Sequence, residues 1–420
     1  MTALLFGVFI ATLLIGVPVA FSIMMAAMAV MLTGDVGIGM IAQRMFASTN
    51  SFPLIAVPFF ILAGDLLAQG KISKFLVEFA ESFLGMIKGG LSIVSVVTGM
   101  FFAAISGSGA ATTAAVGSTL IPQLKERGYN EESAAALIAA AGTIGVVIPP
   151  SVPMVLYAVS AGESLDKLFT NGFVPGILMG LILIVIALVQ AYRHNYPKGA
   201  QFSLKNVLVT FLRAVPGLIM PAIILGGIFS GKFTASEAAA VAVVYAMLVS
   251  FLVYRDMTPK KLFEIMAGSA KTSAVIMIII ACSGPFGWVL ANYRIPEMIA
   301  ESILAVSTDK YILMFVIALV IIIAGIFMET SSAIIILTPV FLPLVQEMGI
   351  DLIHFGLIFV VGIAIGMITP PVAINLFVAS GITGKPIELI AKAVVPYLIG
   401  LLIVFLLIVY LPLFIPSLIV

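Results

Sequence analysis

The sequence predicts an all-α polytopic membrane protein built from two inverted repeats, and three observations lead to this fold class. Hydrophobic residues make up 62% of the 420 positions and charged residues only 9%, whereas a soluble domain carries about 25% charged residues. Apolar segments of about 20 residues recur along the chain without the strict alternation of a transmembrane barrel. Two of these segments are interrupted by a proline pair, at positions 221 apart (366 − 145 = 221).

The charge and cysteine content exclude several classes of partner and cofactor. A net charge of +1 argues against nucleic acid as a partner. Cys282 is the only cysteine, so we expect neither an intramolecular disulfide nor a cysteine-based metal site. No basic stretch or small-residue cleavage site accompanies the first apolar segment, and we therefore do not expect a signal peptide.

The first inverted repeat is expected at residues 1–172. Within it, 91–124 is long enough for a re-entrant hairpin of two short helices, with the small-residue sequence SGSGAATT at its tip. A discontinuous helix follows at 133–160. It is broken at GVVIPPSVP, because one proline inside a helix costs about 3 kcal/mol.

The second inverted repeat is expected at residues 214–392, after a connecting helix and cytoplasmic linker at 173–213. Its hairpin is predicted at 310–345, with GIFMETSS at the tip, and its discontinuous helix at 355–380, broken at GMITPPVAI. A C-terminal helix is expected at 393–420.

Residues that fix backbone shape recur between the two halves. At the constant offset of 221, Pro122 matches Pro343, Gly128 matches Gly349, Gly145 matches Gly366, and the pair Pro149–Pro150 matches Pro370–Pro371. Chance alignment of two apolar segments is the alternative interpretation. The repeat interpretation is favoured because the matches fall on glycine and proline.

The distribution of basic residues predicts that the two halves are inverted. Lys and Arg mark cytoplasmic loops. Lys125 and Arg127 follow the first hairpin, whereas their counterparts, Gln346 and Met348, are uncharged. In this tracing the first hairpin enters from the cytoplasmic side and returns to it, and the second enters from the outer side and returns there. Irregular backbone at membrane depth is tolerated only where it is buried in protein or lines a cavity.

The two tips and the two breaks predict two cation sites. Unwound carbonyls and half-helix C-termini coordinate cations, and the hydroxyl and carbonyl oxygens here suit sodium better than calcium or magnesium, which require carboxylates. The expected first site contains Ser106, Gly107, Ser108, Gly145, Ile148 and Ser151. The expected second site contains Gly325, Thr330, Ser331, Ser332, Gly366, Thr369 and Val372.

Three further polar residues have two interpretations each. Glu329 is expected deep in the membrane, where ionisable groups are functional candidates; alternatively it caps a helix N-terminus. Asn375 is expected to contact substrate as a neutral polar group near the second site, or its amide bonds a neighbouring helix. Asp65 is interpreted as an interfacial or capping residue.

Four motifs resemble the large membrane subunit of tripartite ATP-independent periplasmic (TRAP) transporters, and the resemblance covers essentially the whole chain. They are SGSGAATTAAVGSTLIPQLKERGY, GTIGVVIPPSVPMVLYAV, FMETSSAIIILTPVFLPL and GMITPPVAINLFVASGITG. The resemblance implies a transport domain that moves against a scaffold like an elevator. It places sodium at Ser106, Gly145, Pro149, Ser151, Gly325, Gly366, Thr369 and Val372, and substrate at Ser108, Ser151 and Glu329.

The resemblance further implies import of an organic acid of the sialic acid or C4-dicarboxylate type, coupled to Na⁺ and without an organic cofactor. The implied partners are a small four-helix membrane subunit and a periplasmic substrate-binding protein, in the inner membrane of a bacterium. A carboxylate at Glu329 mildly favours a hydroxyl-rich acid such as sialic acid. An enzyme is not expected.

Two alternatives stay open at this point. A stand-alone sodium–dicarboxylate symporter of the same broad group would transport without a binding protein. An intramembrane serine protease, suggested by SGSG, would need a base near the nucleophile, and no His or Lys is expected at that depth.

Overall fold

The computed structural model describes residues 1–34, 37–199, 201–304 and 309–415, which form helices and connecting segments without a β-strand in these ranges. Within the same ranges, seven helices are long and apolar enough to cross a bilayer, or up to eight if the bent pair at 39–49 and 52–68 counts as one span. The predicted all-α polytopic class is therefore confirmed. The relative orientation of the two halves stays a prediction.

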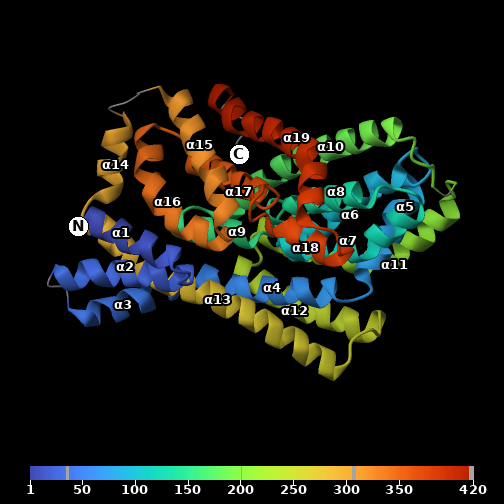
Figure 1. The fold of residues 1–420 in the computed structure, drawn as a ribbon. Coiled ribbons are helices and arrows are strands. Elements are labelled where there is room, and N and C mark those ends of the chain that lie inside the picture. Colours follow the sequence, from blue (N-terminus) through green and yellow to red (C-terminus); the bar gives the residue numbers. More distant parts are fainter. Residues whose placement is uncertain (35–36, 200, 305–308, 416–420) are drawn as a thin grey trace.

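One face of the molecule is a layer of long helices, seen along the lower side of Figure 1. Helix α13 packs against α2, α3 and α4, and α12 packs against α4 and α11. A 3₁₀ turn, Phe52–Ile55, precedes α4, and a π-helical turn, Val249–Val253, follows α12. The bounds are α1 Thr2–Leu14, α2 Val19–Thr33, α3 Ile38–Thr49, α4 Ala56–Ala68, α11 Leu204–Phe229, α12 Ala235–Leu248 and α13 Pro259–Asn292.

The first hairpin and the first interrupted helix lie against this layer. The hairpin turns at Gly107, which has a positive φ of 60° that glycine adopts without strain. The next helix ends at Thr143, passes through the short 3₁₀ turn Ile144–Val146, and resumes at Val152 after the proline pair. The bounds are α6 Gly90–Ser106, α7 Gly109–Glu126, α8 Glu131–Thr143 and α9 Val152–Ala161.

The second hairpin and the second interrupted helix repeat this arrangement of elements. The hairpin turns at Met328 and Glu329, and the following helix is broken between Gly366 and Ile374. Every residue of α17 from Ile353 to Gly366 is buried, as expected for a helix that is apolar all round. The bounds are α15 Lys310–Phe327, α16 Thr330–Glu347, α17 Leu352–Gly366 and α18 Ile374–Thr383.

Four more helices complete the fold. Two long ones, α10 and α19, pack together on the side opposite the α4–α13 layer, and α5 and α14 lie at the two ends (Figure 1). The connecting helix begins at Leu165, earlier than 173, because Ser164 caps it. The last helix begins at Ile387 rather than 393, after Pro386; residues 416–420 of the predicted C-terminal helix lie outside the described ranges. The bounds are α5 Ile72–Leu84, α10 Leu165–Arg193, α14 Ile295–Leu304 and α19 Ile387–Phe414.

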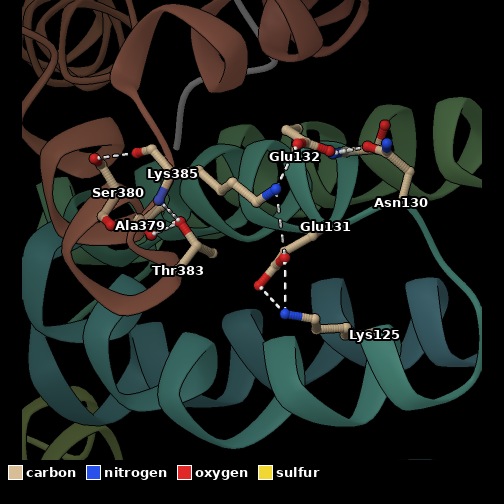
Figure 2. A network of polar contacts seen from close by, with 9 residues as sticks. Lys125, Asn130, Glu131, Glu132, Ala379, Ser380, Thr383 and Lys385 are labelled. Carbon is tan, nitrogen blue, oxygen red and sulfur yellow. Dashed lines mark hydrogen bonds and ion pairs between the residues drawn. The ribbon is translucent and has the colours of Figure 1, made fainter.

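The two halves of the chain are interleaved rather than side by side. Helix α8 packs against α18 and α19, and α9 packs against α16. An ion-pair cluster joins the start of α8 to the segment before α19: Lys385 Nζ lies 3.2 Å from Glu132 Oε1, and Lys125 Nζ lies 3.0 Å from Glu131 Oε2 (Figure 2). The interrupted helices of both halves therefore belong to one packed block.

Candidate functional site

A cavity of about 360 Å³ lies where the two hairpin tips meet the two helix breaks. Both tips contribute to its wall, and so do residues flanking both breaks. Helices α4 and α13 close the remaining side. The lining residues used below are Asp65, Ser106, Ser108, Val146, Thr272, Glu329, Ser331 and Met367.

The first tip is held against the first break by close backbone contact. A Cβ added to Gly145 would lie 2.7 Å from the carbonyl oxygen of Ser108, and one added to Gly107 would lie 2.7 Å from that of Pro150. Such distances are tolerable only without a side chain. Ser106 Oγ lies 2.9 Å from Thr112 Oγ1, and Thr112 is also the neighbour of Gly145. Hydroxyl and carbonyl oxygens thus converge beside the tip.

Most of the residues expected in the first site are brought together. Ser106 and Ser108 line the cavity, and Gly145 lies against the tip. Ser151 caps α9 through Met154 N at 3.3 Å, and its own hydroxyl donates to the carbonyl of Val146, which lines the cavity. The side chain of Ile148 packs on α10 at Gly176, so only its backbone is available to a ligand. Pro149 is buried in the break and is joined to Pro150 by a cis peptide bond.

The second break lies against Gly325, the first residue of the second tip motif, in the last turn of α15. A Cβ added to Gly325 would lie 2.8 Å from Ile363 Cα, and Gly366 packs directly on the backbone of Gly325. Thr369 Oγ1 donates to the carbonyl of Ile365 at 2.8 Å. Val372 is 38% exposed, so its side chain is not a buried part of the site.

Glu329 caps a helix and also lines the cavity, while its functional role stays a prediction. Its carboxylate caps α16, accepting hydrogen bonds from Ser331 N at 2.9 Å, Ser332 N at 3.1 Å and Ser331 Oγ at 3.0 Å. The negative charge therefore sits on the positive end of the helix dipole. Glu329 also lines the cavity.

Asn375 is fully buried and bonds a neighbouring helix, because its Nδ2 donates to the carbonyl of Ala139 in α8 at 3.1 Å. Asn375 does not line the cavity. Its expected contact with substrate stays a prediction, and its Nδ2 ties α18 to α8.

The side chain of Asp65 does not cap a helix, and its expected position at the membrane interface stays a prediction. Asp65 lies within α4, lines the cavity and accepts a hydrogen bond from Ser269 Oγ of α13 at 2.6 Å. The neighbouring Gly64 makes this possible, since a Cβ there would lie 2.9 Å from Ser106 Cα. A glycine next to an acidic residue in an apolar segment was the only sequence signal for this packing. Thr112, within the tip motif, was also missed.

Among the described lining residues there is no Lys, Arg or His, while two carboxylates and several hydroxyl groups face the space. The cavity can therefore accept cations and hydrogen-bond donors directly. An anion needs a compensating positive charge to enter it.

Helical hairpin tips and interrupted helices around a cavity, in a chain with seven candidate membrane spans among its described residues, define the class: a transporter of small solutes. Residues 6–414 match the family model described as "Tripartite ATP-independent periplasmic transporter, DctM component". The chain belongs to this family, and it is a TRAP transporter large membrane subunit.

Two relatives illustrate the similarity. The chain is 42% identical over 414 residues to the isethionate TRAP transporter permease protein DctMQ of Oleidesulfovibrio alaskensis, covering 97% of this chain and 65% of that protein. It is 41% identical over 386 residues to the C4-dicarboxylate TRAP transporter large permease protein DctM of Pseudomonas aeruginosa, covering 92% of this chain and 90% of that protein. This chain thus spans less than two thirds of the first relative and nearly all of the second.

A solved structure has the same fold at low identity. The YdaH transporter of Alcanivorax borkumensis superposes with a TM-score of 0.66 at 13% identity, covering 89% of this chain and 88% of that one. This similarity concerns the fold alone.

Proposed function

We propose that this chain is the membrane subunit through which an organic acid and sodium ions are imported together, by movement of the block of hairpins and interrupted helices against the α4–α13 layer. The cavity between tips, breaks and that layer is the observation that carries the proposal, because it sits at the boundary of the two parts. The organic acid is of the C4-dicarboxylate or sialic acid type. The DctM protein of Pseudomonas aeruginosa is named for the first substrate, and the sialic acid TRAP transporter large permease protein SiaM of Vibrio cholerae, 34% identical to this chain, for the second.

Charge balance gives the physical reason for coupling. An organic anion that leaves water without compensation loses several kcal/mol, and no basic side chain is among the described residues that line the cavity. Sodium ions at the tips and breaks would cancel the charge. Net positive charge moving inward gains about 2.3 kcal/mol per charge per 100 mV.

The proposed sodium ligands are the residues that lie at or beside the tips and breaks. Oxygen atoms of Ser106, Thr112 and the Ser108 carbonyl form the first group. The second group is the Thr369 hydroxyl together with the backbone of Gly325 and Gly366. The remaining proposed positions are Ile148, Pro149, Ser151 and Val372, and the proposed substrate contacts are Ser108, Ser151 and Glu329.

The proposed partners are a small four-helix membrane subunit and a periplasmic substrate-binding protein, in a bacterial inner membrane. A wide lipid- or partner-facing apolar surface is present on α11, where Leu204, Leu208 and Leu212 are exposed. We assign no catalytic role to the SGSG motif: the Ser106 hydroxyl contacts Thr112 rather than a base.

Sodium-driven uptake in proteoliposomes tests the proposal. The chain is reconstituted with and without the two partner proteins, and uptake of labelled sialic acid and C4-dicarboxylates is measured against sodium concentration. Uptake only with all three proteins supports the tripartite function, whereas uptake by the chain alone supports the stand-alone symporter. Absence of sodium-dependent uptake of every acid by the complete system would contradict the proposal.

Two substitutions test the assigned sodium positions against matched controls. Thr369→Ala and Ser106→Ala should raise the sodium concentration for half-maximal uptake, because each removes an oxygen from a proposed site. Thr170 donates to the carbonyl of Asp166 in α10, an i−4 hydrogen bond like that of Thr369 to Ile365. Ser95 lies in α6 like Ser106, and its hydroxyl donates to the carbonyl of Leu91. Thr170→Ala and Ser95→Ala should leave the sodium dependence unchanged.

A further inference from the structure

A second cavity adjoins the first and leads away from it. Its volume is about 550 Å³, and it shares Asp65 and Ala111 with the site cavity. Helices α4, α5 and α7 and the turn between α4 and α5 form its walls. Because two residues border both spaces, Asp65 stands at the junction between them.

The wall of the second cavity suits water and a polar solute. On α7 it presents Ala111, Ala114, Ala115, Ser118 and Thr119, which lie on one helical face. From α5, Ser73 Oγ donates to the carbonyl of Ala115 at 2.9 Å and lies 3.2 Å from Thr119 Oγ1. The small side chains leave space, and the hydroxyl groups can bond water or a solute.

The far end of the second cavity is basic. Lys74 lines it with a side chain that is 69% exposed, paired only loosely with Glu78 at 3.9 Å. Gln69 and Gly70 are also in the wall, and the carbonyl of Gln69 accepts a hydrogen bond from Lys261 Nζ at 2.7 Å.

This end faces the cytoplasm if the sequence-based orientation holds. Lys71 Nζ donates to the carbonyl of Tyr254, next to residues 255–271. This range carries Arg255, Lys260, Lys261 and Lys271, and such basic residues predict the cytoplasmic side. Positive charge at such a mouth raises the local concentration of anions, although Asp256 accepts from Lys71 N and offsets part of it.

The junction has the opposite charge. The Asp65 carboxylate accepts a hydrogen bond from Ser269 of α13. Among the described residues that line the two cavities, Lys74 at the far end is the only basic one. An anion passing Asp65 alone is repelled, whereas one accompanied by a cation is not.

We propose that the second cavity is the passage of the organic anion between the site and the predicted cytoplasmic face, and that Asp65 at its inner end is a specificity-determining residue that disfavours passage of the anion without a cation. The inference rests on the proposed organic-acid transport. It adds a route and a coupling role for a residue outside both tips and both breaks.

The passage is tested by thiol labelling, which does not require transport. With Cys282 replaced by serine, Ala114→Cys places a thiol in the passage and Glu126→Cys places one at the exposed end of the same helix. A charged methanethiosulfonate reagent is added to the cytoplasmic side of inside-out vesicles. Both thiols should react, at rates within about tenfold of each other. Only the modified Ala114→Cys protein should lose uptake. An Ala114→Cys thiol that stays unlabelled while Glu126→Cys reacts would overturn the passage.

The role of Asp65 is tested by efflux of a preloaded labelled acid from proteoliposomes without sodium. Asp65→Asn keeps an oxygen that can accept from Ser269 but removes the charge, and should raise sodium-free efflux about tenfold, as loss of one repulsive contact near 1.4 kcal/mol predicts. Ser269→Ala keeps the charge of Asp65 and removes the hydrogen bond. Its sodium-free efflux should remain within about twofold of that of the unmodified protein.

Equal efflux from Asp65→Asn and the unmodified protein would refute the electrostatic role. An increase with Ser269→Ala as large as with Asp65→Asn would show that the contact only ties α4 to α13. If the unmodified protein takes up no acid with sodium, the proposed transport fails, and the labelling result still decides whether the passage is open to water.

Discussion

Replacing Gly145 by alanine tests whether the fit between the first tip and the first break creates the sodium site. A Cβ at this position would lie 2.7 Å from Ser108 O, 2.6 Å from Thr112 Oγ1 and 3.0 Å from Ser108 C. Ordinary van der Waals contact begins near 3.4 Å, so the carbonyl oxygen of Ser108 would have to move away by about 0.7 Å. A well-packed site allows shifts of only a few tenths of an ångström. Two of the three obstructing atoms are backbone atoms, which cannot turn away as a side chain can.

Forced expansion of a packed site costs about 1 to 3 kcal/mol. If the cost falls on the cation-bound geometry, each 1.4 kcal/mol weakens sodium binding about tenfold. Gly145→Ala should therefore raise the sodium concentration for half-maximal uptake about tenfold or more. It should also reduce the rise in thermal unfolding temperature that sodium produces, because a ligand stabilises only the form that binds it.

The matched control is Gly381→Ala in α18, where an added Cβ meets no atom within 4 Å. Alanine is favoured over glycine in a helix by up to about 1 kcal/mol, so this variant should be as stable as the unmodified protein or more so. Both variants are purified, and unfolding is followed with and without sodium beside uptake in proteoliposomes. An unchanged sodium dependence in Gly145→Ala would refute the argument that the close approach shapes the site.

Glu329→Ala should lower the unfolding temperature and weaken uptake, because α16 loses a cap of about 0.5 to 2 kcal/mol; equal stability of the two proteins by thermal unfolding would contradict the capping role. Glu132 has a pKa lowered by a hydrogen bond from its own backbone and then by Lys385. Glu132 should therefore stabilise the fold at neutral pH, and this contribution should be lost as the pH falls below 4.5, the usual pKa of a glutamate. In Glu132→Gln the unfolding temperature should depend less on pH below 4.5. Tyr157 donates from its hydroxyl to the carbonyl of Leu352 at 2.7 Å, so Tyr157→Phe should cost about 0.5 to 1.5 kcal/mol, and a stability unchanged in thermal unfolding would show that the hydrogen bond contributes nothing.

Local chemistry made most helix boundaries predictable. Asn130, Thr234 and Asp351 each cap a helix with a side-chain oxygen, and these residue types are typical N-caps. The proline pairs stop α8 and α17 where a helix cannot continue. The apolar composition, by itself, was enough to predict a helical membrane protein.

The site was predictable only in part, because its remaining members depend on which helices meet. Ser106 and Ser108 belong to a local motif, and the structure places both in the cavity. Asp65 comes to the same cavity from a helix about 40 residues earlier (106 − 65 = 41), through the close packing at Gly64. For Asn375 a hydrogen bond to a neighbouring helix was one of two interpretations, and the structure shows that bond to a carbonyl of α8. The sequence pattern alone did not identify α8 as the neighbour.

The hydrogen bond between Asn375 and Ala139 has a consequence for biosynthesis. Its two partners are 236 positions apart, and a ribosome adds about 5 to 20 residues per second. The first half thus waits about 12 to 47 seconds for the helices that complete its packing. During that interval the first hairpin and the first interrupted helix lack the packing that α18 gives to α7 and α8. We therefore expect that water retained around the break, or an insertion factor, keeps lipid away from the nascent chain until α18 has been synthesised.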